Sequence, residues 1–212
     1  MPRLVAFGCS YTYGHGLPDC TDGNLGCGPN PSNSAWPKLL ADKLGYTIAN
    51  MSTPGAGNTE ILWRLLNFKF DTDDVCVIMW SYFSRSDFFR YSNNAEGIRI
   101  ERNYRIVEED YKVYQENNNI TNLLAMSHAA YYLNSLNIPS YAYVGAYRAN
   151  KKNIEPGEFD FTLYDNIKIS NLDLSYYLRD YKVDSALDGA HPGIRSHRLI
   201  AERLYNNLNV IH

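Results

Sequence analysis

Short apolar runs alternate along this chain with segments in which apolar residues recur at helical spacing. Continuous apolar runs are typical of strands buried on both faces, and they fall at positions 4–7, 46–50, 74–80 and 140–145. Helical spacing predicts helices at 35–44 and 59–68, from about 119 to 131, and from about 192 to 208. The sequence therefore predicts strands and helices in turn.

This alternation predicts the fold class. Strands that alternate with helices pair in parallel through right-handed crossovers. We expect an α/β fold with three layers (α/β/α), in which a flavodoxin-like, doubly wound, mainly parallel sheet has about five strands. The length of 212 residues suits one domain, 1–212, with irregular insertions near 84–118 and 146–187. The turns after the first three strands should then meet at one edge of the sheet, where such folds bind ligands.

Several residues mark the ends of the predicted helices. Ser34 is a candidate cap of the helix at 35–44, Pro37 suits its first turn, and Gly45 follows its last turn. Pro192 suits the first turn of the final helix for the same reason.

Composition narrows the class of protein. The chain is 45% apolar and 20% charged with a formal net charge of −3, which is ordinary for a globular protein and argues against a nucleic-acid partner. No apolar run approaches the ~20 residues of a membrane-spanning helix. No signal peptide is visible, because glycine soon interrupts the first apolar run. We expect a cytoplasmic or otherwise soluble protein, and the sequence leaves its oligomeric state open.

Cysteine and tyrosine usage add two expectations. The four cysteines are too few for a disulfide scaffold in a chain of this length. Cys20 and Cys27 share a loop and could pair, but we expect free thiols. Many of the 18 tyrosines fall between 82 and 114 and between 141 and 181, where they can pack against strands or form amphipathic walls for sugars.

The turn after the first strand carries a candidate nucleophile. Ser10 lies between Gly8 and Gly14, and these glycines permit a sharp turn from strand to helix. The amide of Ser10 would point into the same space as its hydroxyl and could donate to an oxyanion. The same pattern would also suit a serine that only caps a helix, or a loop that cradles a phosphate.

A candidate base and its partner lie near the other end of the chain. Asp188 stands three residues before His191, so its carboxylate can hold one ring nitrogen while the other accepts a proton from Ser10. Alternatively, Asp188 caps the final helix and His191 lies on the surface. We expect the other histidines to be surface or packing residues: His15, His128, His197 and His212.

The turn after the second strand carries candidate hydrogen-bond donors. Gly55 and Gly57 allow a backbone amide to approach a substrate oxygen, and Asn58 could add a side-chain donor. Ordinary turn chemistry would also explain these residues.

Together these segments resemble the SGNH/GDSL hydrolase family. The stretch 8–14 resembles its first block, whose serine, here Ser10, is the nucleophile. The stretch 188–192 resembles its last block, which implies that Asp188 and His191 complete a triad. The stretch 50–55 resembles the second block, which implies that the Gly55 amide helps to form the oxyanion hole with that of Ser10. The resemblance spans nearly the whole chain in the expected order.

The third block departs from the family pattern. The family places an asparagine that donates to the oxyanion after the third strand, but this turn reads Trp-Ser-Tyr-Phe-Ser-Arg over 80–85. Ser81, Asn58 or a backbone amide could substitute. Loss of one such donor typically lowers the rate by about 10²–10³-fold. Arg85 could bind a substrate carboxylate or phosphate, or form a structural ion pair, and we expect Tyr11 and Tyr82 to contact the substrate.

The resemblance implies a serine ester hydrolase that acts through an acyl-enzyme and needs no metal or organic cofactor. The expected substrate is a small-molecule or glycan ester with a small acyl group, such as acetyl on carbohydrate. Three alternatives remain: a catalytically weak carbohydrate-binding domain of the same fold, an acyltransferase with the same triad, and a flavodoxin-like phosphate-binding module.

Overall fold

Five parallel strands form the central sheet in the part of the chain that the structure describes, which is residues 1–21, 27–82, 85–91, 98–103, 111–144, 168–173 and 181–209. In this computed structural model the strand order is β2-β1-β3-β6-β7. The strands are β1 (Arg3–Gly8), β2 (Thr47–Asn50), β3 (Asp74–Trp80), β6 (Ser140–Val144) and β7 (Lys168–Asp173). Every pairing is parallel, which confirms the predicted flavodoxin-like α/β sheet.

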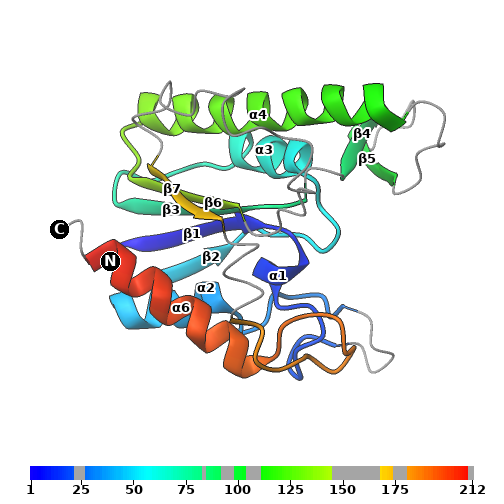
Figure 1. Cartoon of the computed structure of the whole chain (residues 1–212). Coiled ribbons are helices and arrows are strands. Elements are labelled where there is room, and N and C mark those ends of the chain that lie inside the picture. Colours follow the sequence, from blue (N-terminus) through cyan, green and yellow to red (C-terminus); the bar gives the residue numbers. More distant parts are fainter. Residues whose placement is uncertain are drawn as a thin grey trace.

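Helices cover both faces of this sheet and make the three layers visible in Figure 1. On one side lie α2 (Trp36–Leu44) and α6 (Ile194–Asn209), and on the other lie α3 (Asn58–Leu66) and α4 (Tyr111–Ser135). The short α1 (Ser10–Tyr13) follows β1 directly. The first and last long helices therefore pack side by side although most of the chain separates them.

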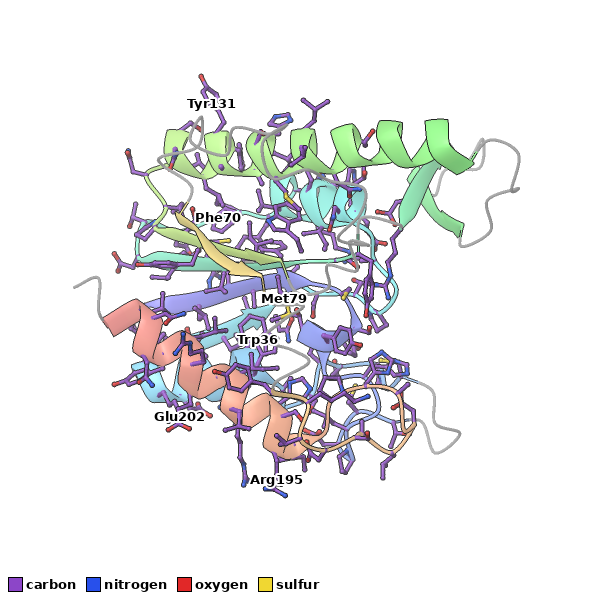
Figure 2. The ribbon with its side chains drawn as sticks, viewed as in Figure 1. Trp36, Phe70, Met79, Tyr131, Arg195 and Glu202 are labelled. Carbon is purple, nitrogen blue, oxygen red and sulfur yellow. The ribbon has the colours of Figure 1, made fainter. Side chains whose placement is uncertain are left out.

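The alternation of side chains along β1 explains the two cores. Leu4 and Ala6 pack with α2 and α6, whereas Val5 and Phe7 pack with α3 and α4. All four side chains are completely buried. Figure 2 shows Trp36 in the layer between the sheet and α6. A strand with two apolar faces is therefore held from both sides, which fixes the position of the turn at its carboxyl end.

The bounds of some elements differ from those predicted. α4 begins at Tyr111 rather than near 119, and the expected insertion near 84–118 contains a hairpin of β4 (Ser86–Tyr91) and β5 (Ile98–Asn103). The expected insertion near 146–187 contains β7. Within these insertions, residues 84, 92–97, 104–110, 146–167 and 174–180 lie outside the described residues, and so does part of each expected tyrosine-rich wall.

The cap of α2 also differs from the prediction. Its N-cap is Ala35 rather than Ser34, and no side chain of the cap residue bonds to the helix. Instead, the amide of Trp36 donates to Nδ1 of the buried His197 at 3.1 Å. The predicted roles of Pro37 and Gly45 are confirmed, since Gly45 ends the helix with φ of 71°.

Two further expectations concern cysteines and membranes. Cys20 and Cys27 form no disulfide, as expected, and their sulfurs lie 3.8 Å apart. Within the described ranges, none of the helices combines the length and the apolar character needed to cross a bilayer.

Candidate active site

The turn between β1 and α1 is sharp because Gly8 has no side chain. A Cβ at Gly8 would lie 2.1 Å from Thr12 Oγ1 and 3.0 Å from the Met79 carbonyl oxygen. The chain therefore bends directly from the strand into α1, whose first residue is Ser10. Gly14 ends the helix with φ of 82°, a left-handed conformation that favours glycine. Ser10 is consequently fixed at the carboxyl edge of the sheet, with 4% of its surface exposed.

Asp184 organises the loop that precedes α6. Its carboxylate accepts hydrogen bonds from the Arg195 and Ser196 amides, both at 2.9 Å, and from the Ser196 hydroxyl. Its backbone carbonyl accepts from the Gly193 amide at 3.1 Å. The carboxylate thus supplies acceptors for the otherwise unpaired amides at the start of the helix. This frame holds residues 185–193 as an ordered loop.

A backbone hydrogen bond joins the segment after α1 to the loop before α6. The Leu187 amide donates to the Gly16 carbonyl at 2.9 Å. Gly16 has φ of 78°, and a Cβ there would lie 2.9 Å from the carboxyl carbon of Asp188. The absence of a side chain at this position therefore allows the C-terminal loop to approach the turn that carries Ser10.

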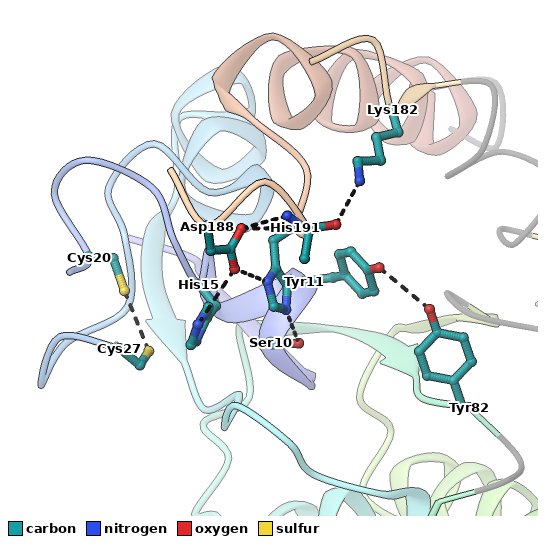
Figure 3. Close-up of polar contacts among 10 residues, drawn as sticks. Ser10, Tyr11, His15, Cys20, Cys27, Tyr82, Lys182, Asp188 and His191 are labelled. Carbon is teal, nitrogen blue, oxygen red and sulfur yellow. Dashed lines mark hydrogen bonds and ion pairs between the residues drawn. The ribbon is translucent and has the colours of Figure 1, made fainter. Parts of the chain in front are cut away.

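Ser10, Asp188 and His191 are hereafter the Ser10 cluster, in which the His191 ring contacts both Ser10 and Asp188 (Figure 3). His191 Nε2 is 3.0 Å from Ser10 Oγ, and His191 Nδ1 is in direct contact with Asp188 Oδ2. The other carboxylate oxygen, Oδ1, accepts from the amides of Ala190 and His191, both at 3.0 Å. The structure thus places side by side the hydroxyl, imidazole and carboxylate that the sequence singled out.

The environment of Asp188 keeps its carboxylate charged. Burial acts to raise the pKa of this group, but hydrogen bonds from the His191 amide and ring and from the Ala190 amide outweigh that effect. The net result is a pKa below the ordinary value of 3.8. Asp188 can therefore accept a proton-bearing Nδ1 and hold the His191 ring in one orientation near neutral pH.

His15 lies beside this cluster, although the sequence predicted only a surface or packing role. Its Nε2 is 3.7 Å from Asp188 Oδ2, and its ring centroid is 4.5 Å from that of His191 with an interplanar angle of 39°. The side chain is 20% exposed. Its proximity to Ser10 in sequence was the available signal, but packing of the distant loop around Asp188 determines the contact.

His15 also belongs to a group of possible metal ligands. In the ranges that the structure describes, His15, Asp188 and His191 bring one donor atom each within 4.8 Å of the others. Asp188 and His191 are already in direct hydrogen-bond contact. We therefore interpret the group as a hydrogen-bonded acid–base cluster.

The three residues expected to contact substrate lie in one row beside His191. The ring of Tyr11 is 5.3 Å from that of His191, and its hydroxyl oxygen is 3.4 Å from that of Tyr82 (Figure 3). Burial raises the pKa of Tyr11, so its hydroxyl remains protonated. Arg85 lies 5.1 Å from the Tyr82 ring centroid and donates to Ala56 O at 3.1 Å and Ser81 Oγ at 2.9 Å. These bonds connect Arg85 to the turns after β2 and β3, and its expected contact with substrate stays a prediction.

The turn after β2 is fixed by hydrogen bonds to Asp87, which lies in the hairpin of β4 and β5. Gly57 caps α3, and its amide donates to Oδ1 of Asp87 at 2.9 Å, while the Glu60 amide donates to Oδ2 at 2.8 Å. A Cβ at Gly57 would lie 2.6 Å from this carboxylate. Gly55, in the same turn, has φ of 82°. The sequence did not predict Asp87 as the cap, because the hairpin brings it there.

Asn58 bonds both to Ser81 and to Asn122, and these three residues are hereafter the Asn58 network. Asn58 Nδ2 donates to the Ser81 carbonyl at 3.3 Å and to Asn122 Oδ1 at 2.7 Å, and Asn58 Oδ1 accepts from the Ser81 amide at 2.7 Å. Both amide hydrogens of Asn58 are therefore engaged, and the side chain is 1% exposed. The Asn58 side chain and the Ser81 amide thus have partners within the fold, and the expected roles of Asn58 and Ser81 at an oxyanion stay predictions.

Comparisons with known proteins agree with this architecture. No protein-family model and no curated protein matches the sequence. A protein from Desulfitobacterium hafniense DCB-2 assigned to the G-D-S-L family of lipolytic proteins matches in structure with a TM-score of 0.50 and 12% identity. That match covers 96% of this chain and 98% of the other.

The acetyl xylan esterase Est2A from the rumen bacterium Butyrivibrio proteoclasticus matches with a TM-score of 0.54 and 14% identity. Here the match covers 98% of this chain but 63% of the other. The chain therefore has the fold of the SGNH/GDSL hydrolases, which the sequence motifs predicted.

Proposed function

We propose that this protein hydrolyses carboxylic esters with Ser10 as nucleophile. The observation that carries the proposal is the continuous contact from Ser10 Oγ through both ring nitrogens of His191 to Asp188 Oδ2. A serine hydroxyl is a weak nucleophile until a neighbouring base accepts its proton, and a third group must orient that base. The Ser10 cluster has this order of contacts.

The proposed reaction proceeds in two halves. Ser10 Oγ attacks the ester carbonyl carbon while His191 Nε2 takes the hydroxyl proton. His191 then gives that proton to the leaving alcohol, and the acyl group remains on Ser10. Water attacks the acyl-enzyme in the same way and releases the acid. Asp188 stays ionised throughout and stabilises the imidazolium that forms in each half.

Backbone amides are the proposed oxyanion donors. Ser10 is the first residue of α1, so its amide has no acceptor within the helix and lies next to its own hydroxyl. The family resemblance adds the amide of Gly55. A side-chain donor of the kind that the family's third block supplies would be absent, so we expect turnover about 10²–10³-fold below that of a site with all three donors.

The aromatic row suggests the substrate class. Tyr11 packs against His191 and its hydroxyl pairs with that of Tyr82, and such aromatic rings with hydroxyls suit a polyol that carries an ester. The likeness to Est2A, an acetyl xylan esterase, points the same way. We propose a small acyl group on carbohydrate as the substrate, hydrolysed without a cofactor. An acyltransferase would form the same acyl-enzyme and differ only in the acceptor alcohol.

Active-site labelling tests the proposal. A fluorophosphonate probe should form an adduct that mass spectrometry maps to Ser10, and Ser10→Ala should abolish both the adduct and release of p-nitrophenol from p-nitrophenyl acetate. Ser127→Ala is the matched control, because its hydroxyl bonds to the Leu123 carbonyl in α4. Labelling at another residue, or full turnover by Ser10→Ala, would contradict the assignment.

The closed Asn58 network favours one second candidate, a carbohydrate-binding domain with little catalysis. Such a domain would bind acetylated oligosaccharides with neither fluorophosphonate labelling nor turnover. Calorimetric titration of the wild-type protein with acetylated and deacetylated xylo-oligosaccharides separates the two functions, because an esterase would consume the former during the measurement.

A further inference from the structure

Two carbonyl groups of α1 accept hydrogen bonds from residues outside the helix. α1 has four residues, and no side chain of its N-cap residue bonds to it. A helix this short is not stable by itself, and its last carbonyls have no partner within it. The Tyr13 carbonyl accepts from the Ser32 amide at 2.9 Å, and the Thr12 carbonyl accepts from Nδ2 of Asn50 at 3.0 Å. The position of Ser10, the first residue of α1, therefore depends on contacts made at the other end of the helix.

The side-chain amide of Asn50 is bonded at both ends. Its Nδ2 donates to the Thr12 carbonyl, and its Oδ1 accepts from the Ser52 amide at 3.2 Å and from the Ser52 hydroxyl. These partners assign the oxygen and the nitrogen of the amide, because only the nitrogen can donate to a carbonyl. Thr12 and Ser52 are both buried, so water does not readily replace these bonds.

The segment that carries Ser52 is itself fixed to the central sheet. The Met51 amide donates to the Ala6 carbonyl at 2.8 Å, and the Thr53 amide donates to the Gly8 carbonyl at 3.1 Å. The chain after β2 thus continues to bond to β1 up to the last residue of that strand. Asn50 therefore connects α1 to a part of the backbone whose position the sheet determines.

We propose that Asn50 is a positioning residue for ester hydrolysis, which holds α1, and with it the hydroxyl and the amide of Ser10, through the Thr12 carbonyl. This inference rests on the proposed esterase function. The reaction needs Ser10 Oγ close to His191 Nε2, now 3.0 Å away, while the Ser10 amide faces the developing oxyanion. A shift of α1 by about 1 Å would weaken both interactions. Asn50 acts on the reaction through α1 and not by contact with the substrate.

A purely structural role for Asn50 makes a different prediction. If Asn50 only stabilised the fold, its loss would lower the fraction of folded protein and leave the rate per folded molecule unchanged. A positioning role lowers kcat and the rate at which a fluorophosphonate reacts with Ser10, although every site still reacts in the end. The rate and the final extent of labelling therefore separate the two roles.

The test uses the full chain with two substitutions of Asn50. Asn50→Asp keeps an acceptor for Ser52 but replaces the donor to Thr12 with an oxygen that repels the carbonyl. Asn50→Ala removes the bonds without adding a charge. Asn67→Asp and Asn67→Ala are the matched controls, because Asn67 Nδ2 donates to the Trp63 carbonyl at 2.8 Å at the exposed end of α3.

Turnover of p-nitrophenyl acetate, fluorophosphonate labelling and the melting temperature are measured on each variant. We expect both Asn50 variants to lower kcat and the labelling rate by about 10–100-fold, with KM within about threefold of the wild type and labelling complete. The Asn67 variants should stay within about threefold of the wild type in all these constants. Incomplete labelling of the Asn50 variants at a wild-type rate per reactive site would overturn the proposal.

Amide hydrogen exchange tests the position of α1 without turnover. The Gly14 and His15 amides both donate to the Ser10 carbonyl at 3.0 Å, so release of α1 from Asn50 should speed their exchange by about tenfold or more. Unchanged exchange in both Asn50 variants would overturn the proposal even if Ser10 is the nucleophile. A wild-type protein that neither reacts with the probe at Ser10 nor turns over would instead refute the esterase function, and the exchange rates would still decide whether Asn50 holds α1.

Discussion

The carboxyl edge of the sheet carries two polar assemblies with opposite properties. In the Ser10 cluster, the side chains of His191 and Asp188 are 22% and 13% exposed, and they form a chain of contacts with the less exposed Ser10. The Asn58 network is at most 2% exposed, and both hydrogens of the Asn58 amide are used within it. The first assembly can exchange a partner for substrate, whereas the second holds the third-strand turn against α3 and α4.

This difference in exposure distinguishes polar groups that can take part in a reaction from polar groups that stabilise the fold. A polar group that is buried with all its bonds made stabilises one conformation, and breaking it leaves partners unpaired. A polar group that remains accessible to water can gain or lose a proton during a reaction. Residue type alone does not distinguish the two, since both assemblies lie at the edge where the fold predicts a site.

The largest predicted change in kcat distinguishes two aspartates that lie four residues apart, Asp188 and Asp184. Asp188→Asn keeps an oxygen that can accept backbone hydrogen bonds but cannot stabilise the His191 cation, so kcat should fall by about 10⁴-fold. Asp184→Asn weakens the cap of α6 and should lower the free energy of unfolding by about 1 kcal/mol while activity stays within a few-fold. Steady-state kinetics and urea denaturation of both variants measure the contrast.

Equal losses of activity in the two variants would contradict this assignment of roles. That result would mean that both carboxylates act by ordering the loop, and that Asp188 has no separate part in proton transfer.

A second contrast is in burial, since His197 is completely buried whereas His191 is partly exposed. Burial lowers the pKa of His197 to about 4 from its ordinary 6.5, because the charged ring would lose its hydration in the core. In the neutral ring, Nδ1 accepts from the Trp36 amide. A depressed pKa means that the unfolded state binds the extra proton more readily. The stabilisation is therefore complete above pH 6.5 and is lost as the pH falls towards 4, by about 3 kcal/mol.

Urea unfolding between pH 7 and 4 measures this loss. His197→Gln should unfold more easily at pH 7 but should lack this part of the decline, whereas His128→Gln should decline like the wild type. A decline of the same size in His197→Gln would show that other groups cause it.

The sequence predicted the central strands well for a physical reason. A strand such as β3, Asp74–Trp80, is covered on both faces, so its apolar run ends where the strand ends. β7, Lys168–Asp173, lies at the edge of the sheet and mixes polar with apolar residues, so no continuous run marked it. The start of α4 was misplaced because its first turns are rich in polar residues.

The site was predictable only where its residues are close in sequence. Asp188 and His191 form a local motif, and glycines flank Ser10 within one turn. His15, Asp87 and Asn122 reach their partners through tertiary packing between segments far apart in the chain. No local pattern encodes those contacts, so sequence reasoning left them out.

A third prediction concerns the Asn58 network. Asn58→Ala removes an amide that bonds to both backbone groups of Ser81 and to Asn122, so the free energy of unfolding should fall by about 1–3 kcal/mol. Turnover of the folded protein should change by less than the 10²–10³-fold that is typical of a lost oxyanion donor. Denaturation and kinetics on the same preparation separate the effects. A loss of turnover in that range with unchanged stability would place Asn58 at the oxyanion after all.

The smallest predicted change in kcat distinguishes alanine substitutions at two glycines near Asp188, Gly16 and Gly189. Gly16 and Gly189 have left-handed φ angles of 78° and 71°, so alanine at either position should cost about 1 kcal/mol of stability. A Cβ at Gly16 would also lie 2.9 Å from the Asp188 carboxyl carbon, whereas one at Gly189 would meet nothing within 4 Å. Gly16→Ala should therefore lower kcat about tenfold or more, because a displacement of about 1 Å moves Asp188 off the His191 ring. Gly189→Ala should keep nearly full kcat. Equal kcat in two equally stable variants would mean that the position of Asp188 tolerates such a shift, and that the Ser10 cluster depends less on this approach of the two loops than its geometry indicates.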